Sequence, residues 1–374
     1  MNKNGKTRIR IAQPWITEHE INYVNDAVKN GWGDHRFDYI KKLENEFSLL
    51  HQTRYAVATS SCTGATHMAL EAMGIGNGDE VILPEITWAS CPSVVTYTGA
   101  KPVFVDVKEN SWCIDPKKIV EAITSKTKAI MPVHVYGNVC EMDEIMNIAD
   151  RFDLKVIEDS AESIGSKYKN KRVGTMGDCG VFSFHGTKMA SSGEGGMFIT
   201  NNKELFEKFN ILHDQGRIPN EEKFFFPHKI GYKYKISNLQ AALAYAQIER
   251  LEELVNKKIQ IFNWYKKSLE DLNFIGMNIQ QEYVKNCYWM PTIVFNESVN
   301  INRDDLMKYL DKKGIDSRPF FYPLSSLPMF KKQENNNISY SLSKRGMYLP
   351  SAFHMSKEDV GYVVECIKNF LEKK

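Results

Sequence analysis

The chain lacks paired-cysteine motifs, long apolar runs and a recognisable targeting segment. Its seven cysteines stand singly, with no CxxC pair, which favours reduced thiols over a disulfide framework or a zinc site, so we expect no metal. No apolar stretch approaches the length of about 20 residues that a membrane helix needs. The basic start MNKNGKTRIR is followed by no apolar region, unlike a secretory signal. These absences predict a soluble cytoplasmic protein.

The chain also lacks an excess of one charge and a dinucleotide fingerprint. It has 48 basic and 46 acidic side chains, and the net charge of +2 gives no reason to expect nucleic acid or membrane as a partner. The absence of an appended basic helix-turn-helix argues against a DNA-binding regulator. The turn SSCTG at 60–64 is not a GxGxxG, so a dinucleotide-binding oxidoreductase is set aside.

What the chain does have is an alternation of strand and helix patterns between residues 54 and 200. Hydrophobic residues make up 43% of the sequence, enough for a sizeable core. Helical patterns at 64–74, 115–124 and 141–152 lie between short runs rich in β-branched residues. This alternation predicts an α/β fold with a largely parallel sheet. The predicted strands are 54–59, 79–84, 101–107, 128–137, 154–159, 180–185 and 195–200.

The sequence changes character after residue 200. The segment 237–258 places Leu239, Ala242 and Leu243 on one helical face, and we predict a single long helix that leaves the large domain. Later residues mix helical stretches with short strands such as 288–295. Because 374 residues are more than one core usually serves, we predict a large domain over 1–250 and a smaller one over 251–374.

The stretch FSFHGTKMASSGEGGMFIT (182–200) surrounds one lysine, Lys188, with small residues. A lysine used covalently as an imine needs close approach by a planar carbonyl compound. The nearby glycines would clear side chains from that approach, and Ser183 adds a hydroxyl. The alternative is an exposed lysine in a glycine-rich turn. The glycines in question are Gly186, Gly193, Gly195 and Gly196.

Other groups in the chain match what a pyridoxal phosphate (PLP) site requires. Asp159 ends an apolar strand, where α/β proteins place ligand-contacting side chains, and a carboxylate is needed opposite the pyridine nitrogen. The segment 60–63 precedes a helix, whose N-terminal amides suit a phosphate. Trp88 follows a strand and offers a flat ring for stacking. Singly, each could be a helix cap, a turn former or core packing, so the order along the chain supports the cofactor site.

Over nearly its whole length the chain resembles the DegT/StrS sugar-nucleotide aminotransferases, most of all the perosamine-synthase-like members. The motifs include GDEVILPEITW, VIEDSAESIGSKYKNKRVGTMGD, FSFHGTK…GEGGM, GYKYKISNLQAALAYAQIERL and RPFFYPLSSLPMF. The resemblance implies the fold type I, aspartate aminotransferase-like architecture: a large, mostly parallel sheet domain and a smaller C-terminal α+β domain. It also implies pyridoxal phosphate as cofactor and a homodimer with shared active sites.

The resemblance assigns roles position by position. Lys188 becomes the Schiff-base lysine and proton shuttle, Asp159 the partner of the pyridinium nitrogen, and Glu162 a contact near the ring hydroxyl. The remaining implied contacts are ring stacking by Trp88, phosphate binding by Ser61, Cys62, Thr63 and Ser183, and a phosphate contact across the dimer by Lys233. We further expect substrate binding by His185, Trp32, Arg318 and Tyr322, and for His185 a structural role at the strand end stays open.

The chain departs from the family pattern in places. Lys233 stands where the family usually has asparagine, so it either reaches the phosphate as a point charge or turns to solvent. Cys62 replaces a glycine, so the backbone there cannot need a strongly positive φ. Ser325 replaces a histidine in the late proline-rich segment.

The resemblance implies transfer of the amino group of L-glutamate to a nucleotide-linked 4-keto-6-deoxy sugar, with GDP-4-keto-6-deoxymannose as the favoured substrate, within lipopolysaccharide O-antigen biosynthesis. A UDP- or dTDP-linked sugar and transfer to C3 stay open, as does a non-catalytic regulator of the same fold. A related dehydratase carries histidine in place of the lysine, so Lys188 argues against that activity.

Overall fold

A seven-stranded sheet forms the centre of the computed structural model, which describes residues 8–219, 223, 225–333 and 335–372. The strand order is β1-β9-β8-β5-β4-β2-β3, and β9 alone runs against its neighbours, so the predicted, mostly parallel α/β sheet is confirmed. The strands are β1 (Tyr55–Thr59), β2 (Glu80–Pro84), β3 (Lys101–Val105), β4 (Thr127–Ile130), β5 (Lys155–Asp159), β8 (Cys179–Ser183) and β9 (Gly196–Thr200).

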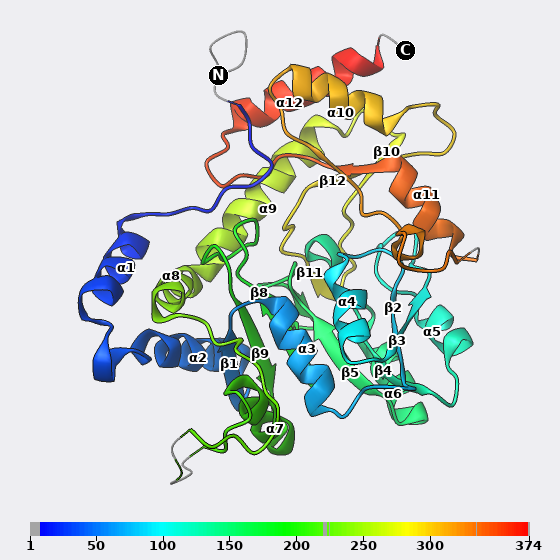
Figure 1. Cartoon of the computed structure of the whole chain (residues 1–374). Helices are drawn as coiled ribbons and strands as arrows, with labels where there is room; N and C mark the ends of the chain where they lie inside the picture. Colours follow the sequence, from blue (N-terminus) through cyan, green and yellow to red (C-terminus); the bar gives the residue numbers. More distant parts are fainter. Residues whose placement is uncertain (1–7, 220–222, 224, 334, 373–374) are drawn as a thin grey trace.

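Helices cover the sheet, because its central strands are apolar on both faces. Every residue of β2, β8 and β9 is buried. Helix α3 (Cys62–Ala72) packs on β8 and β9, and α4 (Ser90–Tyr97) packs on β2 and β3 (Figure 1). The other helices up to residue 249 are α1 (Glu18–Asn30), α2 (Asp38–His51), α5 (Pro116–Ala122), α6 (Met142–Phe152), α7 (Lys203–His213) and α8 (Asn238–Glu249).

One predicted strand is shorter than expected. The segment 128–137 was predicted to be extended throughout, but β4 ends at Ile130. Pro132 follows, and it has no N–H to continue a ladder. Tyr136 then takes a left-handed φ of 53°, which turns the chain towards the site described below.

The C-terminal part builds a second, antiparallel sheet in the order β10-β12-β14-β13. A separate apolar cluster around Ile293, Leu306 and Ile367 lies between this sheet and its helices. The main cluster also includes Trp289 and Phe320, and the division at residue 250 stays a prediction. The elements are α9 (Leu251–Ser268), β10 (Ile275–Met277), β12 (Thr292–Phe295), α10 (Arg303–Lys312), β13 (Arg318–Pro319), α11 (Asn337–Arg345), β14 (Gly346–Tyr348) and α12 (Lys357–Leu371), with a small sheet of β11 (Val284–Lys285), β6 (Lys167–Tyr168) and β7 (Lys171–Arg172).

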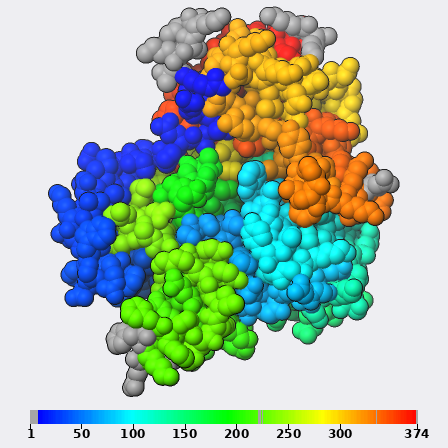
Figure 2. Space-filling view, in the orientation of Figure 1, coloured from blue at the N-terminus to red at the C-terminus, as the bar shows by residue number. Residues whose placement is uncertain are grey.

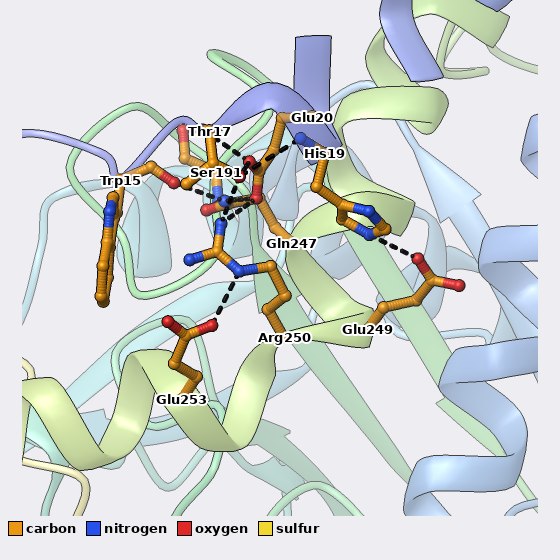
Figure 3. A network of polar contacts seen from close by, with 9 residues as sticks. All are labelled: Trp15, Thr17, His19, Glu20, Ser191, Gln247, Glu249, Arg250 and Glu253. Atoms are coloured by element: carbon orange, nitrogen blue, oxygen red, sulfur yellow. Dashed lines mark hydrogen bonds and ion pairs between the residues drawn. The ribbon is translucent and has the colours of Figure 1, made fainter. Parts of the chain in front are cut away.

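The prediction of one long helix over 237–258 is wrong, because the chain breaks into α8 and α9 at Arg250. Figure 3 shows the contacts at this junction: the Arg250 guanidinium is held by Glu20, at 2.6 Å, and by Glu253, at 2.8 Å. Glu20 is fully buried and also accepts from Gln247, at 2.7 Å. This network joins α1 to the junction of α8 and α9.

The segment that follows β13 is tied back to the carboxyl ends of β2 and β3. The Glu85 carboxylate accepts from the amide of Ser325, at 2.7 Å, and from the side chain of Asn336. Asp106 accepts from the first amides of α11, including that of Ser339, at 2.8 Å. In Figure 2 this orange segment lies against the cyan surface of α4 and its neighbours. Among the described residues, no helix is long and apolar enough to cross a bilayer.

Candidate active site

A cavity of 390 Å³ opens where the carboxyl ends of β5 and β8 meet the N-terminus of α3. Ligand sites in α/β proteins occur at this edge, and the volume is in the range of small-molecule pockets. Residues predicted for the site meet here from four separate stretches of sequence. The predicted residues that line it are Ser61, Cys62, Thr63, Trp88, Asp159, Glu162, Ser183, His185 and Lys188.

Asp159 is the last residue of β5 and is held in a fixed orientation. Its Oδ1 accepts from the amide of Ala161, at 3.0 Å, and its Oδ2 accepts from the thiol of Cys91, at 3.2 Å. Burial, followed by the nearby Asp159 charge, raises the pKa of Cys91 well above its usual range, so this thiol keeps its proton and acts as a donor. The carboxylate is therefore aimed into the cavity by donors on both oxygens.

The Lys188 amine lies inside the cavity, between an acid and an aromatic ring. Its Nζ is 3.3 Å from Glu162 Oε1 and 4.1 Å from the centre of the Trp289 ring. The other carboxylate oxygen of Glu162 accepts from the amide of Tyr136, at 2.9 Å. Burial raises the pKa of Glu162, although the Lys188 charge opposes the rise. The predicted Lys188, Glu162 and Asp159 thus face one space.

The start of α3 provides a place for an anion. Ser61 is the N-cap, and its hydroxyl accepts from the amide of Gly64, at 3.0 Å. The first amides of a helix have no partner within it and, with the helix dipole, favour an anionic group. Cys62 begins the helix and is absent from the residues with positive φ, as expected from the sequence. Ser183, at the end of β8, lines the same side.

We expected the glycines near Lys188 to leave space for a planar compound to approach the lysine. This expectation is corrected, because the glycines mainly shape the loop that carries Lys188. Only Gly195 of the four lines the cavity. A Cβ on Gly196 would lie 2.4 Å from the backbone of Ser61 and Cys62, so this glycine lets β9 and α3 approach each other. Gly193 has a φ of +82°, and Gly186 donates to its carbonyl at 2.8 Å.

Two predicted residues lie at the rim of the cavity. Trp88 is 63% exposed, and its ring stands 6.4 Å from that of Phe321. The His185 side chain is half exposed and contacts Thr187 Oγ1, at 3.0 Å. Both positions suit contact with a bound molecule entering from solvent.

Four predicted residues lie outside the cavity of the single chain, and their roles stay predictions. Trp32 is 62% exposed and donates to the carbonyl of Val28, at 2.7 Å. Lys233 lines a separate, shallow depression with Gly231 and neighbouring residues. Arg318 lies on β13 and is exposed, and Tyr322 is also exposed.

Ser325, at the family's usual histidine position, is buried and does not line the cavity. Its hydroxyl lies 3.0 Å from that of Tyr340 and accepts from the amide of Gln333, also at 3.0 Å. It therefore supports the fold of the proline-rich segment.

The sequence reasoning missed Trp289 and Cys91, which contact Lys188 and Asp159 directly. Trp289 lies in the predicted strand 288–295, of which the structure forms only Thr292–Phe295, and Cys91 lies within α4, so neither is part of a local motif that signals a site. Thr187, Glu194, Phe321 and Tyr348 are among the other residues that line the cavity.

These groups fit pyridoxal phosphate. An amine and a carboxylate face the same cavity, a helix N-terminus at one wall suits the phosphate, and both oxygens of Asp159 already have donors that keep it oriented. The residues that would hold it are Ser61, Cys62, Thr63, Ser183, Asp159 and Lys188.

Comparison with known proteins supports the same kind of site over nearly the whole chain. The model of the DegT/DnrJ/EryC1/StrS aminotransferase family matches residues 14–368. A GDP-perosamine synthase of Escherichia coli O157:H7 is 39% identical, over 98% of this chain and 99% of its own. One from Caulobacter vibrioides is 36% identical, over 97% and 98%. The PMP-form structure of the putative sugar aminotransferase Spr1654 from Streptococcus pneumoniae superposes with a TM-score of 0.91 at 28% identity, covering 98% of both chains, and its PLP form with 0.90, covering 98% and 99%.

Proposed function

This chain belongs to the DegT/DnrJ/EryC1/StrS aminotransferase family, and we propose that it converts GDP-4-keto-6-deoxymannose to GDP-perosamine. It is a pyridoxal phosphate-dependent sugar-nucleotide aminotransferase, as the sequence predicted. The observation that carries the assignment is the meeting of Lys188, Asp159 and the α3 N-terminus in one cavity, in a chain that matches perosamine synthases over nearly its full length.

The chain's own residues would divide the work as follows. Bound pyridoxal phosphate supplies an electron sink for a carbanion beside the transferred nitrogen. The negative charge of Asp159 would favour a protonated ring nitrogen, and the donors from Ala161 and Cys91 would keep the carboxylate oriented for this contact. Lys188 Nζ takes the proton from the α-carbon of L-glutamate and, in the second half, delivers a proton to C4 of the sugar. Water supplies the keto oxygen of the 2-oxoglutarate that leaves in the first half, and the keto oxygen of the sugar leaves as water in the second.

The donor, the sugar contacts and the assembly belong to the proposal as well. L-glutamate is the proposed donor, and His185 and Trp88 stand at the rim where a sugar nucleotide would enter. We include a homodimer, in which the segment 231–240 brings Lys233 to the neighbour's phosphate; Lys233 does not line the cavity of its own chain. O-antigen biosynthesis is the proposed setting.

A half-reaction tests the substrate. The protein is loaded with pyridoxamine phosphate, and GDP-, UDP- and dTDP-linked 4-keto-6-deoxy sugars are added separately while the return of pyridoxal absorbance is followed. Rapid return with the GDP sugar alone is expected. Return with only a UDP or dTDP sugar would replace the substrate and keep the reaction, whereas return with none would send the search to 3-keto sugars.

A further inference from the structure

Trp289 is the largest side chain in contact with the Lys188 turn, and it touches that turn twice. Its ring face lies 4.1 Å from Lys188 Nζ, and its Nε1 donates to the carbonyl of Thr187, at 2.8 Å. Only 4% of Trp289 is exposed, so its ring has a fixed place. A buried indole face attracts an ammonium group, and the Nε1 bond fixes the backbone one residue before the lysine.

The acid on the other side of the amine is fixed through the same neighbour. Tyr136 is fully buried, and its ring stacks on Trp289 with centres 6.2 Å apart and planes at 14°. The amide of Tyr136 donates to Glu162 Oε2 at 2.9 Å, and the other oxygen of that carboxylate contacts Lys188. Tyr136 therefore contacts both groups that hold the amine, Trp289 through its ring and Glu162 through its amide.

The backbone that presents these rings is strained. Tyr136 has a φ of 53° and Tyr288, next to Trp289, a φ of 50°. Such left-handed conformations are unfavourable in residues other than glycine, and they persist where the surroundings impose them. Asn286, which is fully buried, accepts from the amide of Tyr288 at 2.7 Å and so imposes one of them. A Cβ on Gly137 would lie 2.8 Å from the amide nitrogen of Trp289, so the two turns are packed directly together.

We propose that Trp289 is a positioning residue for Lys188: its indole face holds Lys188 Nζ opposite Glu162, and its ring nitrogen fixes the turn that carries the lysine. The proposal rests on the proposed role of Lys188 as the group that binds the cofactor and moves the proton. In this proposal a residue of the C-terminal part of the chain, Trp289, directly positions the lysine that follows the large sheet. Without the ring, the amine would reach its working position only part of the time.

The rate at which pyridoxal phosphate becomes attached to Lys188 tests this proposal. Cofactor-free protein is mixed with pyridoxal phosphate, samples are reduced with borohydride, and the modified Lys188 peptide is measured by mass spectrometry. Trp289→Phe keeps a ring face and loses the bond to Thr187, and we expect attachment to slow about 3- to 10-fold. Trp289→Leu loses both contacts, and we expect a further loss of about 3- to 30-fold.

Trp112→Phe is the matched control. Trp112 is also buried and packs edge-on against Tyr136, with ring centres 6.3 Å apart, but it does not line the cavity. We expect Trp112→Phe to attach the cofactor at the wild-type rate, and Trp289→Phe to lower the kcat of the L-glutamate half-reaction more than it changes KM. Wild-type attachment in folded Trp289→Leu would overturn the proposal. If that variant does not fold, equal rates for Trp289→Phe and Trp112→Phe would do so.

Failure of the proposed function would look different. Wild-type protein would then attach pyridoxal phosphate at Lys188 and aminate no sugar nucleotide, and the attachment rates of the variants would still measure what Trp289 does. If both wild type and variants attach the cofactor equally fast, the positioning role is refuted whatever the substrate.

Discussion

Cys91 and Asp159 lie 68 positions apart in the sequence, and the thiol of the first donates to Oδ2 of the second across 3.2 Å. Cys91 sits in α4 and Asp159 at the end of β5, so the bond joins a covering helix to the predicted cofactor partner. The hydroxyl of Thr87 lies 3.6 Å from the same sulfur and completes a short chain of polar groups. Asp159 thereby keeps its orientation towards the cavity.

Loss of the Cys91 thiol should lower the rate of the sugar half-reaction and weaken the binding of the cofactor. We expect Cys91→Ala to lower the rate of the sugar half-reaction about 3- to 10-fold, since a donor to a charged group is removed. Cys91→Ser restores a donor and should recover most of the rate. Cys366→Ala, a buried cysteine of α12 outside the cavity, is the control and should leave the rate unchanged. Equal rates for Cys91→Ala and Cys366→Ala would show that Asp159 does not need this donor.

Replacing Lys188 with alanine or arginine separates the effect of its positive charge from its ability to form an imine and move a proton. Lys188→Ala should lower turnover by about 10²- to 10⁴-fold or more, because the group that moves the proton is removed. Lys188→Arg keeps a positive charge beside Glu162 yet cannot form an imine, and it should be as inactive. Turnover is measured as 2-oxoglutarate formation with the GDP sugar present. Retained activity in either variant would refute the assigned role.

The Glu20 network should contribute measurably to stability. Burial raises the pKa of Glu20, but hydrogen bonds from Thr17 and Gln247 outweigh this, and the pKa lies below its usual value. Glu20→Gln leaves Arg250 without its buried partner and should lower the free energy of unfolding by about 3 kcal/mol. Glu253→Gln removes the half-exposed partner of the same guanidinium and should cost under about 1 kcal/mol. Urea unfolding of the two variants measures the difference, and equal costs would contradict the prediction.

Lys258 should make stability depend on pH in the alkaline range. Its amine is buried and donates to the hydroxyl of Ser351 at 2.9 Å, and burial lowers its pKa to about 7. An unfolded lysine has a pKa of about 10.4, so between these values the unfolded chain binds one more proton than the folded chain. The free energy of unfolding contributed by this group therefore rises with pH, by at most about 1.4 kcal/mol per unit, and is constant below pH 7.

The comparison of wild type with Lys258→Met isolates that contribution. The difference in free energy of unfolding between the two should shift in favour of wild type as the pH rises from 7 towards about 10. The neighbouring Cys287 thiol, whose pKa burial raises to about 11, titrates mainly above this window. A difference that stays constant with pH would mean that the amine is not held in an apolar site.

The sequence alone determined that a mostly parallel sheet forms, and it gave the order of the candidate site residues along the chain. Strand and helix patterns are local, because they depend on residues a few positions apart, and parallel strands must place their carboxyl ends at one edge. That rule brings Ser183 and Asp159 together once β5 and β8 are recognised as neighbouring strands. The lysine at 188 follows a few residues after the end of β8.

Only the tertiary structure decided how that lysine is held. Trp289 and Thr187 lie 102 positions apart, and no local pattern foretells a contact across that distance. The same reason applies to the junction at Arg250, whose guanidinium contacts Glu20 in α1, 230 positions away. From the sequence, Gly196 was expected to leave room beside Lys188, but it lies where β9 contacts α3. The packing of two elements depends on the side chains of both, so neither sequence segment alone predicts this contact.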